Sequence, residues 1–116
     1  MAKKKVVFVD DSTMILRWAR RAFGRECDVQ TMECPSMALS VIGKQPHSPI
    51  AAPDIIVSDF DMPYMNGVQF LTKMRDAFPA AELILYTGRH DVECSFATVV
   101  GDKDSYRLEA EIKRRM

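Results

Sequence analysis

The chain has 116 residues, of which 47% are hydrophobic and 28% charged, and its 16 basic and 16 acidic residues give a formal net charge of zero. This length fits one packed domain and is too short for two ordinary ones, and the composition excludes a disordered chain. Without a net charge, no overall field attracts nucleic acid or an anionic membrane. We therefore expect a single domain over residues 1–116 with no nucleic-acid partner.

The sequence also bears on the compartment. No apolar run approaches the roughly 20 residues that span a bilayer, and the lysine-rich start leads into a strand-like segment instead of a signal-peptide core. The three cysteines have no CxxC spacing, which is typical of reduced thiols. These features predict a cytoplasmic protein without a membrane partner.

The first half of the chain alternates apolar runs with amphipathic segments. Residues 6–9 are rich in β-branched side chains and predict a strand buried on both faces. Apolar residues then recur at helical spacing from Ser12 to Gly24, which predicts a helix. A second strand is expected at residues 29–34, followed by a helix that begins at Pro35.

The second half repeats this alternation after a proline-rich loop over residues 44–53. Residues 55–57 are uniformly apolar and predict the third strand. A helix is expected to begin after Gly67 and to end before Pro79. Two further strands are predicted at residues 83–86 and 97–100, and a last helix runs to the C-terminus. This order predicts an α/β fold with a doubly wound, five-stranded parallel sheet.

Polar side chains follow the predicted ends of four strands. Asp10 and Asp11 come after the first strand, Asp59 after the third, Thr87 after the fourth, and Lys103 shortly after the fifth. Ligands of open α/β sheets bind outside the carboxyl ends of the strands. We therefore expect these side chains to share one crevice.

The composition of this crevice favours phosphoryl transfer. Carboxylates brought together repel each other, and a hard divalent cation with oxygen ligands is the usual remedy. Mg²⁺ fits because it accepts one or two carboxylates together with water and phosphate oxygens. Lys103 and Thr87 can hold phosphoryl oxygens while a carboxylate attacks the phosphorus and forms an acyl phosphate.

These motifs resemble the signature set of response regulator receiver domains of two-component signalling, the CheY-like superfamily. Asp10 and Asp11 after the first strand are combined with D-x-x-M-P-x-x-x-G from Asp59 to Gly67, and with Thr87 after the fourth strand. The resemblance covers nearly the whole chain. It implies a flavodoxin-like sheet with the strand order 2-1-3-4-5.

The resemblance also implies roles for single residues. The metal ligands would be Asp10 (through water), Asp11, Asp59 and the backbone carbonyl of Asp61. Asp59 would be the phosphoacceptor, Thr87 the switch hydroxyl and Lys103 the basic partner of the phosphoryl group. The protein would be a signalling switch that assists its own phosphorylation and dephosphorylation, and not an enzyme. Its implied partner is a sensor histidine kinase or a phosphotransfer protein, and the family also allows a homodimer.

Three features depart from the family pattern. Only 16 positions separate Thr87 from Lys103, fewer than in most receivers, so the fourth helix is expected to be shortened or missing. Val100 stands where the fifth strand usually carries Tyr or Phe, and Asp104 replaces the proline that usually follows the lysine. The aromatic side chain that changes its rotamer in the usual switch is therefore absent from this position.

Two alternative functions stay open. A pseudo-receiver would keep the fold as a protein-interaction module without using phosphate, which the short fourth-helix region favours and the complete set of polar residues disfavours. The segment Asp59-Phe60-Asp61 also resembles the D-x-D motif of haloacid-dehalogenase-like phosphatases, with Asp59 as nucleophile and Asp61 as general acid. That motif normally lies on the first strand and needs a downstream acidic pair, whereas the acidic pair here lies upstream.

Overall fold

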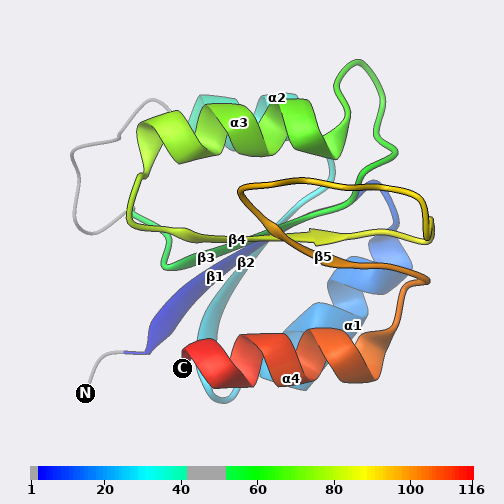
Figure 1. Cartoon of the computed structure of the whole chain (residues 1–116). Coiled ribbons are helices and arrows are strands. Elements are labelled where there is room, and N and C mark those ends of the chain that lie inside the picture. Colours follow the sequence, from blue (N-terminus) through cyan, green and yellow to red (C-terminus); the bar gives the residue numbers. More distant parts are fainter. Residues whose placement is uncertain (1–2, 42–51) are drawn as a thin grey trace.

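A single parallel sheet organises the computed structural model, which describes residues 3–41 and 52–116. Its strands are β1 (Lys4–Val9), β2 (Cys27–Met32), β3 (Ile55–Ser58), β4 (Glu82–Tyr86) and β5 (Thr98–Val100), in the order β2-β1-β3-β4-β5. Helices α2 (Pro35–Val41) and α3 (Gly67–Ala77) cover one face, and α1 (Thr13–Phe23) and α4 (Ser105–Arg115) cover the other (Figure 1). The predicted doubly wound fold and its strand order are confirmed.

The two faces of the sheet carry two separate cores because successive side chains of a strand point to opposite sides. In β1, Val6 and Phe8 belong to the core under α1 and α4, whereas Val7 and Val9 belong to the core under α2 and α3. All four side chains are almost fully buried. The uniformly apolar run is therefore the sequence of a central strand that is covered on both faces.

Local capping fixes where the helices begin. The Ser12 side chain caps α1 by accepting a hydrogen bond from the Ile15 backbone N–H at 3.4 Å. Asn66 and Gln69 form a reciprocal capping box at the start of α3, with both N···O distances at 2.9 Å. These caps set the helix starts directly after the loops that carry Asp10, Asp11 and Asp59.

The second strand differs from its prediction by two residues. It spans Cys27–Met32 instead of residues 29–34, and it pairs in parallel with all six residues of β1. This edge strand contains buried, intermediate and exposed side chains and has no continuous apolar run, so its limits follow from its register with β1. The loop expected at residues 44–53 lies largely outside the described residues.

The helix that receivers usually have between the fourth and fifth strands is missing here, as the short spacing from Thr87 to Lys103 predicted; the helix labelled α4 follows β5. Residues 87–97, all of them described, contain no helix between β4 and β5. Val92 and Phe96 from this segment pack against the core under α2 and α3, and the Arg75 guanidinium of α3 lies 4.3 Å from the centre of the Phe96 ring. A packed loop thus takes the place of the helix. No helix among residues 3–41 and 52–116 is long and apolar enough to cross a membrane.

Candidate functional site

Three carboxylates meet at the carboxyl ends of β1 and β3. Oxygen atoms of Asp10, Asp11 and Asp59 all lie within 4.8 Å of one another. Asp10 and Asp59 are buried, whereas Asp11 is exposed, so the cluster opens to solvent on the Asp11 side. The structure therefore brings together the carboxylates that the sequence placed at one sheet edge.

The backbone at the strand ends holds the two buried carboxylates. The Asp59 backbone N–H donates to the Val9 carbonyl at 3.0 Å, which ties the end of β3 to the end of β1. The Asp10 carboxylate accepts a hydrogen bond from the Ser12 N–H at 2.9 Å, and the Asp59 carboxylate accepts one from the Phe60 N–H at 2.8 Å. Each carboxylate thus has a fixed orientation before any ligand arrives.

Lys103 lies between the two buried carboxylates. Its Nζ is 2.9 Å from Asp10 Oδ2 and 3.5 Å from Asp59 Oδ1. It reaches them from a turn in which Asp102 and Lys103 both have left-handed backbone conformations, with φ values of 57° and 47°. Non-glycine residues seldom adopt this conformation, and it persists only where surrounding contacts hold it. One such contact is the hydrogen bond from the Lys103 N–H to the Thr87 carbonyl at 2.8 Å.

The charges of the site fit a divalent cation. Three carboxylates and one ammonium leave a formal charge of minus two when all are ionised. Burial raises the pKa of Asp59 above its ordinary value and the Asp10 carboxylate adds to this effect, while the ammonium of Lys103 acts in the opposite direction. Oxygen donors of this kind are the ligands that Mg²⁺ prefers, and one exposed member leaves room for its water ligands. The residues present therefore fit the metal that the sequence predicts.

Thr87 and Arg89 line the same end of β4. The Thr87 side chain is fully buried, and its Oγ1 accepts a hydrogen bond from the Arg89 backbone N–H at 3.1 Å. The Arg89 guanidinium in turn binds both carboxylate oxygens of Asp61, at 2.8 and 3.0 Å, and lies 5.2 Å from the centre of the Phe60 ring. The ion pair between Asp61 and Arg89 thus joins the loops after β3 and β4 at the mouth of the site.

Gly67 explains the glycine of the Asp59 to Gly67 motif. A Cβ atom at this position would lie 2.1 Å from the Asp59 carbonyl oxygen and 2.6 Å from Leu85 Cδ1. The close approach also allows the Gly67 N–H to donate to the Phe60 carbonyl at 2.8 Å. Because only a hydrogen atom fits there, α3 packs directly against the backbone of the predicted phosphoacceptor.

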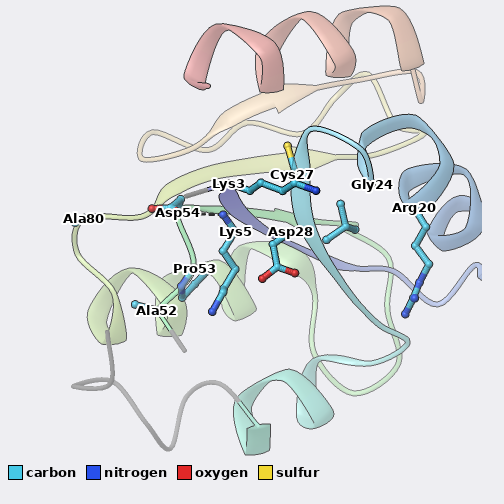
Figure 2. A pocket seen from close by; sticks show the side chains of 11 residues that line it. Lys3, Lys5, Arg20, Gly24, Cys27, Asp28, Ala52, Pro53, Asp54 and Ala80 are labelled. Carbon is cyan, nitrogen blue, oxygen red and sulfur yellow. Dashed lines mark hydrogen bonds between the residues drawn. The ribbon is translucent and has the colours of Figure 1, made fainter. Parts of the chain in front are cut away.

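An open hollow lies at the other end of the sheet. Lys3, Lys5, Cys27 and Asp54 are among the side chains that line it (Figure 2). Lys5 is near the start of β1 whereas Asp10 follows its end, so the hollow is separated from the acidic cluster by the length of the strand. It has no part in the chemistry of the carboxylates.

Comparison with known proteins identifies the family. The family model of the response regulator receiver domain matches residues 6–104, which include the acidic cluster, Thr87 and Lys103. The chain belongs to the response regulator receiver domain family. For this receiver domain, the resemblance seen in the motifs is confirmed, as is its place in two-component signalling.

The relatives of this receiver domain are longer proteins. The uncharacterized transcriptional regulatory protein YhcZ of Bacillus subtilis is 24% identical over 90% of this chain and 48% of its own length. A protein-glutamate methylesterase/protein-glutamine glutaminase of Pseudomonas syringae is 32% identical over 71% of this chain and 22% of its own length. The chain therefore spans about half or less of these relatives.

Solved receiver domains share the fold. A CheY-like response regulator receiver domain protein from Methanospirillum hungatei superposes with a TM-score of 0.82 at 22% identity, covering 98% of this chain and 94% of its own. A receiver domain protein from Clostridium thermocellum gives a TM-score of 0.80 at 19% identity, covering 97% and 93% of the two chains. At these identities the likeness concerns the fold alone.

Sequence reasoning gave no role to one residue beside the site. Tyr86, the last residue of β4, donates a hydrogen bond from its hydroxyl to the Lys103 carbonyl at 2.8 Å. The signal was an aromatic residue with a polar group at the end of a buried strand, directly before Thr87. Periodicity could assign Tyr86 to the core, but it could not show which loop its hydroxyl meets.

Proposed function

We propose that this receiver domain accepts a phosphoryl group on Asp59 from a sensor histidine kinase or a phosphotransfer protein. The observation that carries the proposal is the cluster of Asp10, Asp11 and Asp59, with the Lys103 ammonium between the two buried members. The cluster provides a carboxylate nucleophile and a net negative charge that a divalent cation can neutralise. The Lys103 ammonium can bind the oxygens of the transferred phosphoryl group. We also propose that the protein acts in the cytoplasm and can form a homodimer.

Each residue has a task in this reaction. A carboxylate oxygen of Asp59 attacks the phosphorus, and the bond from phosphorus to the donor breaks. Lys103 exchanges its contacts with Asp10 and Asp59 for the new phosphoryl oxygens. The Thr87 hydroxyl, whose oxygen accepts from the Arg89 N–H, donates its own hydrogen to another phosphoryl oxygen. Asp10, Asp11, Asp59 and the backbone carbonyl of Asp61 would hold Mg²⁺. When bound, the metal neutralises charge that builds up on the phosphoryl oxygens.

The phosphatase alternative requires Asp61 to act as a general acid. Its two carboxylate oxygens instead accept hydrogen bonds from Nε and one terminal nitrogen of the Arg89 guanidinium. These hydrogen bonds hold the pKa of Asp61 below its ordinary value, whereas a general acid must keep its proton near neutral pH. The geometry therefore favours the receiver over the phosphatase.

The proposal is tested by intact mass after incubation with acetyl phosphate and Mg²⁺. Wild-type protein is expected to gain the mass of one phosphoryl group, and Asp59→Asn is expected to gain none. A wild-type chain that stays unmodified would support the pseudo-receiver instead. Steady turnover of a phosphomonoester would support the phosphatase.

The pair between Asp61 and Arg89 is expected to prolong the phosphorylated state. It lies at the mouth of the site and shields the acyl phosphate from water. Both side chains are about half exposed, at 57% and 49%, so solvent screens the pair and its contribution is small. Arg89→Ala should therefore dephosphorylate faster than wild type by at most about fivefold. Dephosphorylation is followed by intact mass after removal of the donor.

The matched control for this prediction is Arg107→Ala, which removes an exposed arginine from α4. It should dephosphorylate at the wild-type rate. A rate for Arg89→Ala that equals or falls below that of wild type would show that the pair does not shield the phosphoryl group.

A further inference from the structure

Tyr86 makes three contacts with Lys103, the lysine of the site. Its hydroxyl donates to the Lys103 carbonyl at 2.8 Å, and its own backbone carbonyl accepts a hydrogen bond from Lys103 Nζ at 3.2 Å. The ammonium also lies 4.6 Å from the centre of the Tyr86 ring, within the range of a cation–π contact. Both the backbone and the side chain of Lys103 are therefore held by one residue.

The hydroxyl contact acts on a turn that needs support. Asp102 and Lys103 are consecutive left-handed residues, a backbone conformation that is unfavourable for residues other than glycine. Burial raises the pKa of the Tyr86 phenol, so its hydroxyl keeps the proton that it donates to the turn. This turn sets the position from which the Lys103 side chain reaches Asp10 and Asp59.

The Tyr86 ring also contacts helix α1. The Tyr86 and Trp18 rings are stacked, with centroids 6.3 Å apart and planes 22° from parallel. Trp18 in turn meets the Phe23 ring edge to face at 5.6 Å. Trp18 is partly buried at the core under α1 and α4, so the Tyr86 ring is in contact with α1 through Trp18.

The side chain next to Tyr86 on the neighbouring strand β5 is small. Val100 pairs with Tyr86 in the register of β4 and β5 and is completely buried. The position that usually carries an aromatic residue in this family is therefore filled by a small side chain. In this chain the aromatic ring next to the lysine comes from β4 instead of β5.

We propose that Tyr86 is the positioning residue for Lys103, and that its ring couples the position of the ammonium to Trp18 on α1. The inference rests on the proposed phosphorylation of Asp59. When the ammonium moves from Asp10 toward phosphoryl oxygens, its contact with the Tyr86 ring changes, and the stack with Trp18 changes with it. The α1 face then differs between the two states, as a population shift requires.

The positioning role is tested with Tyr86→Phe, which removes the hydroxyl and keeps the ring. Phosphorylation by acetyl phosphate is expected to slow about three- to tenfold, the effect of one hydrogen bond. Mg²⁺ affinity should stay within about twofold of wild type, because Tyr86 acts through Lys103 and not through the carboxylates. Tyr106→Phe, at a tyrosine that is 86% exposed on α4, is the matched control and should phosphorylate normally.

A double-mutant cycle separates positioning from a general structural effect. In a Lys103→Ala background, adding Tyr86→Phe should change the phosphorylation rate by less than about twofold, because the ammonium it positions is gone. A full three- to tenfold loss in that background, or a normal rate for the single variant Tyr86→Phe, overturns the positioning role. An unmodified wild type would instead reject the proposed function itself.

The coupling to α1 is measured in wild-type protein without any substitution. Trp18 is the single tryptophan, so tryptophan emission reports the surroundings of this one residue, which include the Tyr86 ring. Beryllofluoride added after saturation with Mg²⁺ is expected to change the emission of wild type and of Tyr106→Phe, and to leave that of Asp59→Asn unchanged. If emission stays constant in wild-type protein that acetyl phosphate phosphorylates, the coupling is overturned.

Discussion

Replacing Gly67 by alanine is expected to destabilise the domain by about 3 kcal/mol and to abolish phosphorylation. The added Cβ would lie 2.1 Å from the Asp59 carbonyl oxygen, so either α3 or the end of β3 must move. Alanine gains up to about 1 kcal/mol in helix propensity, but this gain does not compensate for a collision with backbone. Any movement of the Asp59 backbone also displaces its carboxylate from Asp10 and Asp11. Urea denaturation measures the stability, and intact mass measures the phosphorylation.

Gly88→Ala is the control for this prediction. It adds the same methyl group beside the same site, but its Cβ would be 3.7 Å from Cγ of the flexible Lys103 side chain. Its stability should stay within about 1 kcal/mol of wild type. Equal stabilities of the two variants would show that α3 does not need the close approach at Gly67.

Removing the Asp11 carboxylate is expected to weaken Mg²⁺ binding by about 100-fold or more, since loss of a direct ligand should exceed the 10- to 100-fold effect of losing a supporting contact. In Asp11→Ala the formal charge of the site falls from minus two to minus one, and the exposed oxygen donor disappears. Asp10→Ala should have a smaller effect, because Asp10 is already neutralised by Lys103 at 2.9 Å. Calorimetric titration with Mg²⁺ compares the three proteins.

The matched control is Asp28→Ala, which removes an exposed carboxylate near the start of β2, at the far end of the sheet. It should bind Mg²⁺ as wild type does. If Asp11→Ala binds Mg²⁺ as tightly as Asp28→Ala, the metal is not held by the acidic cluster.

Much of the site could be predicted because it depends on strand ends. The buried runs that end before Asp10 and Asp59 are central strands, and parallel strands bring their carboxyl ends to the same edge. Asp61 and Arg89 lie two residues after Asp59 and Thr87 and carry opposite charges, and the structure joins them by two hydrogen bonds. By contrast, the limits of β2 were wrong by two residues, because an edge strand is defined by its partner.

The sequence by itself determined the order of elements, the absence of a helix between β4 and β5, and the set of polar residues at the sheet edge. Hydrophobic periodicity, capping residues and loop length encode these properties locally. Only the tertiary structure decided that Lys103 lies between Asp10 and Asp59, and that Tyr86 connects it to Trp18. These contacts join segments far apart in the chain, and the side chains that meet are selected by packing between elements, which no local pattern records.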